Sequence, residues 1–158
     1  METDRVNELI KILKMKKHPE GGYYVEIYKS RMEVKADGKS RKAVSAIYFL
    51  LPKGEVSKPH RIAWDEIWHV YEGELELVWA DEQVHRERLG KVREGVKAFA
   101  CVPAGAWQAA KPLSDYALVG CTVSPGFEWN DFEIAEGEIL KELLRRFPEF
   151  EEFSSQGM

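Results

Sequence analysis

Short apolar runs, rich in β-branched and aromatic residues, alternate with polar turns through the middle of the chain. Runs of this composition predict β-strands. Turn sequences such as Asp37-Gly38, Glu72-Gly73 and Pro125-Gly126 separate them at short, even intervals. The expected strands cover residues 23–29, 44–51, 66–71, 74–80, 84–89, 96–102, 106–110 and 116–123. Many short strands at this spacing predict an all-β dominated sandwich or barrel.

The two ends of the chain have a helical spacing instead. Near the start, apolar residues recur in the i, i+3, i+4, i+7 pattern at Val6, Leu9, Ile10 and Leu13. They predict a helix over about 3–16, which ends before Pro19 because a proline disfavours helical geometry in the residue before it. A second apolar stripe before Pro148 predicts a helix over about 136–147. We expect both helices to pack outside a barrel formed by residues 20–134, in one domain covering 1–158.

Bulk properties exclude some classes of partner. The formal net charge is −4 and the isoelectric point is about 5.7, which argues against nucleic acid or an anionic membrane as partner. The start of the chain lacks a signal-peptide pattern, and no apolar run is long enough to cross a bilayer. These observations predict a soluble, cytoplasmic protein.

Cys101 and Cys121 are the two cysteines, and both lie in apolar, strand-like runs. Adjacent strands could bring them together as a bridge. We favour two buried thiols that pack as small apolar groups, because the chain shows no secretion signal.

One stretch combines turn residues with groups that can bind ligands or transfer protons. Gly54, His60, Glu66 and Gly73 follow one another at near-equal spacing, and Ile62 stands two residues after the histidine. A second stretch contains Pro103, Gly105 and Gln108, after Gly95.

These two stretches resemble the two signatures of the cupin superfamily. In that comparison Ile62 replaces a second histidine, Gln108 replaces a third, and Pro112 replaces an asparagine. Further segments resemble one uncharacterised cupin family, the fifth cupin subgroup, which is a domain of unknown function. These segments are H-P-E-G-G-Y-Y at 18–24, S-A-I-Y-F-L-L at 45–51, V-P-A-G-A-W-Q-A-A at 102–110 and V-G-C-T-V-S-P-G-F-E at 119–128. The resemblance implies a double-stranded β-helix, or jelly-roll barrel, that pairs as a homodimer. It also implies a comparison with sugar epimerases and isomerases.

The resemblance aims His60, Glu66 and Gln108 at one hollow. We assign His60 as a catalytic base and Glu66 as the catalytic partner that orients it, for proton removal next to a carbonyl of a sugar or sugar phosphate. A structural pair that only maintains the barrel is the alternative. The candidates for binding this ligand are Gln108, Trp68, Ser57 and Arg61.

Two further functions stay open. His60, Glu66 and Gln108, completed by water, could hold Mn or Zn weakly, although the loss of two imidazoles argues against tight binding. No cofactor is therefore assigned. A ligand sensor without enzymatic activity is the other alternative.

Strand alternation separates the remaining candidates. If Glu66 points into the barrel, Trp68 does too, whereas His69 faces outward. Trp68 is thus the aromatic wall on which a sugar ring would stack. The glycine pair Gly21-Gly22 permits unusual backbone angles, so the segment before it either shapes a turn or places His18 or Glu20 at the barrel mouth, and the sequence does not choose.

Overall fold

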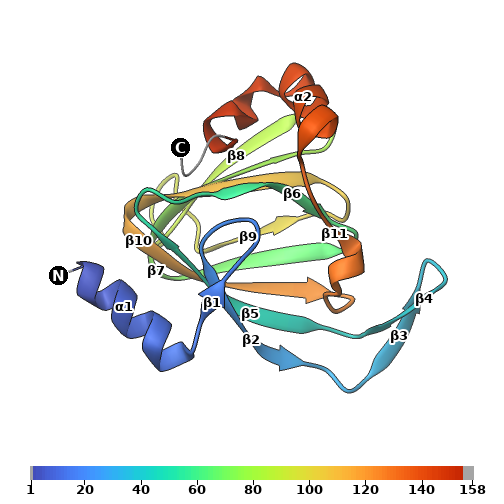
Figure 1. Ribbon diagram of the computed structural model, residues 1–158, viewed down its shortest axis with the longest axis horizontal. Helices are drawn as coiled ribbons and strands as arrows, with labels where there is room; N and C mark the ends of the chain where they lie inside the picture. Colours follow the sequence, from blue (N-terminus) through green and yellow to red (C-terminus); the bar gives the residue numbers. More distant parts are fainter. Residues whose placement is uncertain (1, 155–158) are drawn as a thin grey trace.

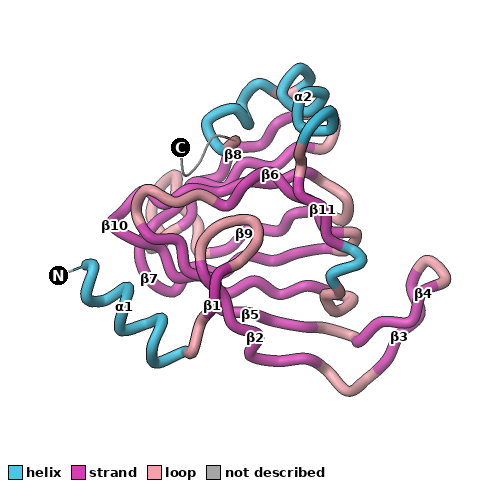
Figure 2. Tube along the Cα trace, in the orientation of Figure 1, coloured by secondary structure: helices cyan, strands magenta, loops and turns pink. Residues whose placement is uncertain are grey.

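The computed structural model describes residues 2–154, and Figure 1 shows a curled β-sheet with helices outside it. The helices are α1 (Glu2–Leu13) and α2 (Gly137–Arg146), and there are two described 3-10 turns, η1 (Trp129–Asp131) before α2 and η2 (Pro148–Phe153) after it. The strands are β1 (Lys16–Lys17), β2 (Tyr23–Lys29), β3 (Glu33–Ala36), β4 (Lys39–Lys42), β5 (Ser45–Pro52), β6 (Ser57–Ile62), β7 (Asp65–Ala80), β8 (Val84–Leu89), β9 (Phe99–Val102), β10 (Trp107–Ser124) and β11 (Phe132–Ile134). Strand accordingly dominates the trace in Figure 2. The predicted all-β jelly-roll class is confirmed.

Strand β10 organises the sheet. It pairs in antiparallel fashion with β5 and β6, and along most of its length with β7. The sheet order β1-β2-β5-β10-β6-β11 forms one path, while β7 also pairs with β8 and β9. A single long strand that contributes to both walls curls the sheet into a barrel, with β3 and β4 projecting as a separate hairpin (Figure 1).

Two expected strand breaks do not occur. Residues 66–71 and 74–80 belong to the single strand β7, and residues 107–110 and 116–123 belong to β10. Gly73 allows this continuity, because a side chain there would place its Cβ 2.1 Å from the carbonyl oxygen of Tyr116. The glycine marks a close approach of two backbones rather than the end of a strand.

Strand β6, which carries His60, is absent from the predicted strands. Its sequence, Ser57–Ile62, contains a lysine, a proline, a histidine and an arginine, so it lacks the apolar alternation that signals a strand. Pairing with β10 on one side and β11 on the other supplies the missing stabilisation. This strand depends on tertiary contacts that the local sequence does not show.

The first helix ends earlier than the predicted residue 16. Lys14 adopts a left-handed conformation with φ 58°. Its N–H donates to Lys11 O (3.3 Å), and the Met15 N–H donates to Ile10 O (2.9 Å). This pair of bonds is a Schellman motif, which closes a helix by satisfying its last carbonyls. The next residues form β1 instead.

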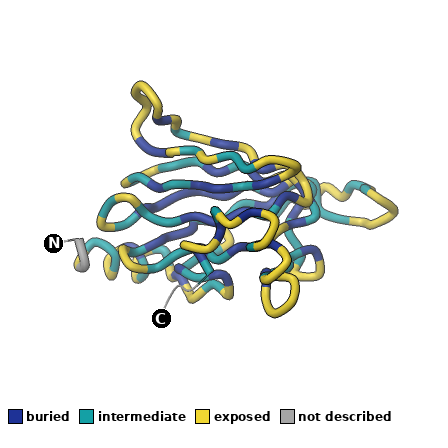
Figure 3. The backbone as a smooth tube through the Cα atoms, turned by 90° about the horizontal axis from the view of Figure 1, so that it is seen from above, coloured by how far each residue is buried: buried dark blue, intermediate teal, exposed yellow. Residues whose placement is uncertain are grey.

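The core has an inner part and an outer part, and buried positions alternate along the strands in Figure 3. Inside the barrel, Phe49, Trp68, Leu75 and Leu77 pack together. On the outside, the C-terminal segment covers Val78, Ala80 and Ala109 with its buried side chains, among them Leu143, Phe147, Phe150 and Phe153. Both helices pack outside the sheet as expected, since α1 covers Leu50 and Leu118 through Leu9.

The two cysteines differ in environment. Cys121 is buried, whereas Cys101 is exposed, and both are free. The prediction of two buried thiols is therefore wrong for Cys101. Its neighbours Ala100 and Val102 point into the core, so strand alternation turns Cys101 outward. Among residues 2–154, no helix has the length and apolar character needed to cross a membrane.

Candidate functional site

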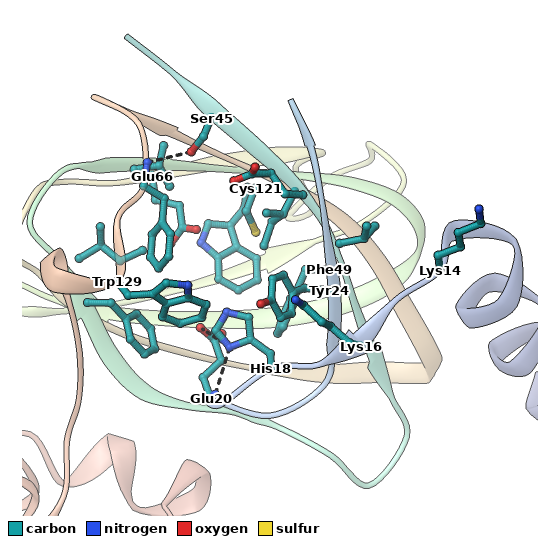
Figure 4. A pocket seen from close by; sticks show the side chains of 18 residues that line it. Lys14, Lys16, His18, Glu20, Tyr24, Ser45, Phe49, Glu66, Cys121 and Trp129 are labelled. Carbon is teal, nitrogen blue, oxygen red and sulfur yellow. Dashed lines mark hydrogen bonds and ion pairs between the residues drawn. The ribbon is translucent and has the colours of Figure 1, made fainter. Parts of the chain in front are cut away.

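A pocket of about 450 Å³ opens between strands β2, β5, β7 and β10 and the η1 turn. Its polar groups come from His18, Glu20, Ser45, Glu66 and Cys121 (Figure 4). Its walls are largely aromatic, formed by Tyr24, Phe49, Trp68, Phe127, Trp129 and Phe132. Few polar groups in a mostly apolar hollow of this size are typical of a small-molecule site.

The structure brings His60, Glu66 and Gln108 together. They come from β6, β7 and β10, and all three are buried. The Gln108 amide nitrogen donates to Glu66 Oε1 (2.8 Å), while Trp68 Nε1 donates to Gln108 Oε1 (2.8 Å). These two bonds fix the orientation of the amide, so Trp68 and Gln108 hold Glu66 in place.

His60 lies behind the pocket rather than in its wall. Its Nδ1 is 2.7 Å from Lys58 O, and its Nε2 is 3.3 Å from Glu20 Oε1. A carbonyl can only accept, so Nδ1 carries the proton and a neutral ring presents a lone pair at Nε2. Burial lowers the pKa of His60, against the opposing effects of Glu66 and the Lys58 carbonyl. The group that His60 faces directly is Glu20.

Glu20 occupies a central place that the sequence left open. Its carboxyl accepts a hydrogen bond from Ser57 Oγ and faces His60. Its backbone carbonyl accepts from the Lys58 N–H (2.7 Å), which ties the Glu20 turn to β6. Burial raises the pKa of Glu20 to about 8, although the Ser57 bond acts in the opposite direction. Glu20 therefore holds a proton at neutral pH.

Glu66 is the second carboxyl in the pocket. Burial raises its pKa to about 7, and Glu20 adds to this effect once it is ionised. His60, Gln108 and Cys121 lower it in part. At neutral pH, Glu66 is thus divided between an ionised form that can accept a proton and a neutral form that can donate one.

The H-P-E-G-G segment is both a shaped turn and a source of pocket side chains, the two alternatives that the sequence left open. His18 and Glu20 line the pocket, and the segment is also a shaped turn, in which the Gly21 N–H donates to His18 O (3.0 Å). Gly22 has φ 73°, and a Cβ there would lie 2.6 Å from Leu50 O. In the sequence, the feature that could have identified this part of the site is the pair of glycines next to the titratable residues His18 and Glu20.

The other predicted ligand-binding residues are placed differently. Trp68 forms part of the pocket wall. Ser57 does not line the pocket, and its hydroxyl instead donates a hydrogen bond to the carboxyl of Glu20, which does. Arg61 does not enter the pocket, because its side chain pairs with Glu133 (2.8 Å) and covers the ring of Trp107 on the outer face. His69 does not line the pocket either, and it stacks on Phe99.

The residues predicted to hold a metal do not fit one. Gln108 turns its amide nitrogen toward Glu66 and uses its oxygen for Trp68, and an amide N–H has no lone pair for a cation. The two nitrogens of His60 face Lys58 O and Glu20. Within residues 2–154, no group of three or more His, Cys, Asp or Glu side chains is arranged to hold a metal ion.

The match that decides the family covers most of the barrel. A family model described as "Cupin superfamily (DUF985)" matches residues 7–135. The chain belongs to this cupin family. A curated relative, the uncharacterized protein YML079W of Saccharomyces cerevisiae, is 29% identical over 161 residues, covering 88% of this chain and 80% of the yeast protein.

Solved structures agree with this assignment. A hypothetical protein from Leishmania major is 30% identical with a TM-score of 0.85, over 94% of this cupin and 97% of that chain. A protein from Shewanella oneidensis is 31% identical with a TM-score of 0.83, over 95% and 97% of the two chains. The names of these relatives state no activity.

Proposed function

We propose that this cupin binds a small sugar-like molecule in the pocket and transfers a proton next to its carbonyl group, as sugar isomerases and epimerases do. The supporting observation is the pair of buried carboxyls, Glu20 and Glu66, with pKa values of about 8 and about 7 in one aromatic-walled hollow. Two carboxyls that exchange protons near neutral pH are a suitable acid and base.

In this proposal Glu66 is the base. Ionised Glu66 takes a proton from the carbon beside the carbonyl, and the electron pair of the broken C–H bond moves toward the carbonyl oxygen. Protonated Glu20 supplies a proton to that oxygen. To give an epimer, a proton returns to the same carbon on its other face while the enol O–H gives its proton back to ionised Glu20. To give an isomer, a proton adds to the former carbonyl carbon, and the hydroxyl on the adjacent carbon passes its proton to ionised Glu20 and becomes the new carbonyl. The atoms and charges balance in both cases without an oxidant or reductant.

The surrounding residues have supporting roles in the same scheme. His60 presents its Nε2 lone pair 3.3 Å from Glu20 Oε1, so it can accept a hydrogen bond from protonated Glu20 and hold that acid in place. Gln108 and Trp68 hold Glu66 in one orientation through their two hydrogen bonds. Lys14, Lys16 and Glu26 also line the pocket, and the two lysines could pair with a phosphate or carboxylate group of the ligand.

Deuterium exchange tests this function without knowledge of the product. The protein is incubated in D₂O with a panel of sugar phosphates and the matching sugars, with and without EDTA, and ¹H NMR follows the proton beside the carbonyl. We expect exchange for at least one phosphorylated compound, unaffected by EDTA. Thermal stabilisation by a compound that never exchanges would overturn the catalytic part and leave a ligand-binding protein without turnover.

Loss of exchange on adding EDTA would instead favour the metal-assisted alternative with Mn or Zn. The homodimer and the cytoplasmic location stay predictions. Tyr71 on β7 and Phe99 on β9 are more than half exposed, which is consistent with a second copy of the chain covering that surface.

A further inference from the structure

The imidazole of His18 has no part in the chemistry proposed above, although it lines the same pocket. Aromatic rings surround it, with centroid distances of 4.7 Å to Tyr24, 5.6 Å to Trp129 and 5.7 Å to both Phe49 and Phe132. Figure 4 shows the ring among these side chains and beside Glu20. A polar ring held in this way needs an explanation for each of its nitrogens.

The Nδ1 atom of His18 is occupied. The backbone N–H of Glu20 donates to it over 3.1 Å. Because Nδ1 accepts this bond, it carries no proton in the neutral ring, and the proton must be on Nε2. Burial, with a smaller effect of His60, lowers the pKa of His18 to about 3. The ring is therefore neutral throughout the physiological pH range.

The Nε2–H group of His18 remains available to a ligand. Among residues 2–154, the Nδ1 bond is the sole hydrogen bond that the ring makes, and the other polar contact, from Glu20 Oε1 at 3.6 Å, is also to Nδ1. In the same part of the chain, no fully buried side-chain nitrogen or oxygen lacks a partner. The Nε2 atom is thus accessible, and the open space beside His18 is the pocket.

The geometry points to His18 as a hydrogen-bond donor to the carbonyl oxygen of the ligand, which makes the ligand a small hydroxycarbonyl compound. This inference rests on the proposed function and adds the group that polarises the carbonyl. A neutral N–H stabilises the negative charge that develops on the oxygen when Glu66 removes the neighbouring proton. Unlike an imidazolium, it does not lower the pKa of Glu66 by adding a positive charge.

The turn that holds His18 is rigid. The His18 N–H donates to Gly22 O (2.9 Å), while the Glu20 amide holds the ring. The same three-residue segment therefore aims both an acid, the Glu20 carboxyl, and a neutral donor at the pocket. A fixed donor stabilises developing charge without reorganisation during the reaction.

The protonation of His18 can be measured without any ligand. In protein labelled with ¹⁵N-histidine, we expect two-dimensional NMR to show the Nε2–H tautomer of His18 unchanged from pH 5 to 8. The titratable groups that line or adjoin the same pocket are Glu20, Glu26, Glu66, His60, Tyr24, Cys121, Lys14 and Lys16. A proton on Nδ1, or titration of the ring in this range, would overturn the inference even if the proposed function is correct.

Two variants distinguish the roles of the two ring nitrogens of His18. His18→Asn keeps an acceptor near the position of Nδ1 and removes the distant donor, whereas His18→Gln places an amide N–H₂ near the position of Nε2. The probes are dihydroxyacetone phosphate and glycerol 3-phosphate, which differ at the carbonyl. We expect His18→Asn to weaken binding of the first about tenfold and of the second less than twofold, and His18→Gln to recover most of the loss.

Three other outcomes would count against His18 as a hydrogen-bond donor to the carbonyl, and a fourth would count only against the proposed catalysis. Equal weakening of both probes in His18→Asn would mean that the ring only shapes the pocket. Equal binding of both probes to the wild type would mean that no group recognises the carbonyl. Failure of the wild type to bind either probe would exclude this ligand class, whereas binding without deuterium exchange would contradict the proposed catalysis and leave the donor intact.

Discussion

Replacing Glu66 with glutamine is expected to lower the rate of deuterium exchange on the substrate by about 10²- to 10⁴-fold, the usual contribution of a positioned general base. The amide has no basic lone pair at neutral pH, so the proton beside the carbonyl has no acceptor. Its oxygen can still accept the hydrogen bond that Gln108 donates to Glu66 (2.8 Å). The effect should therefore appear in the rate with little change in ligand affinity.

A matched variant separates this effect from a general loss of charge. Glu94 is exposed and does not line the pocket, so Glu94→Gln should exchange at the wild-type rate. Thermal unfolding of both variants checks that the barrel is intact. Exchange by Glu66→Gln within threefold of the wild type would remove Glu66 from the role of base.

Replacing Glu20 with glutamine is expected to remove a pH dependence of stability. The pKa of Glu20 is raised to about 8 in the folded protein, from 4.5 for an ordinary glutamate. Between these values the folded state binds the proton more tightly than the unfolded state, so the free energy of unfolding falls as pH rises through this window. Above the folded pKa the contribution is lost.

The expected size follows from the same window. From pH 6 to pH 8.5 the wild type should lose about 2 kcal/mol of unfolding free energy that Glu20→Gln keeps. Urea unfolding at both pH values measures the difference, and comparing the two proteins cancels most of the contributions of Glu66, His18 and His60. The same decline with pH in both proteins would show that Glu20 is ionised in the folded state at neutral pH.

Spacing and alternation in the sequence identified much of this site. The distance between His60 and Glu66, and the turn before Gln108, predicted that the three would share one hollow. All three are buried and Gln108 bonds to Glu66, but of the three Glu66 alone lines the pocket. Strand alternation placed Trp68 in the wall and His69 outside it. These inferences succeeded because a strand fixes the direction of a side chain once one neighbour is known.

The parts of the site that could not be predicted from the sequence depend on contacts between distant segments of the chain. Glu20 and His60 are separated by a long stretch of chain, and their contact is set by the bond between Glu20 O and the Lys58 N–H. The polar sequence of β6 gives no strand signal of its own. The role of base, predicted for His60, is therefore given to Glu66 in the proposal above, because Glu66 lines the pocket and His60 does not.

The central claim is that two carboxyls in one pocket exchange protons near neutral pH. The most direct measurement is a ¹³C NMR titration of the glutamate side-chain carboxyls, with Glu20 and Glu66 assigned through their glutamine variants. We predict titration of Glu66 at about pH 7 and of Glu20 at about pH 8. Titration of both near 4.5, the ordinary value for glutamate, would contradict the proposed acid and base.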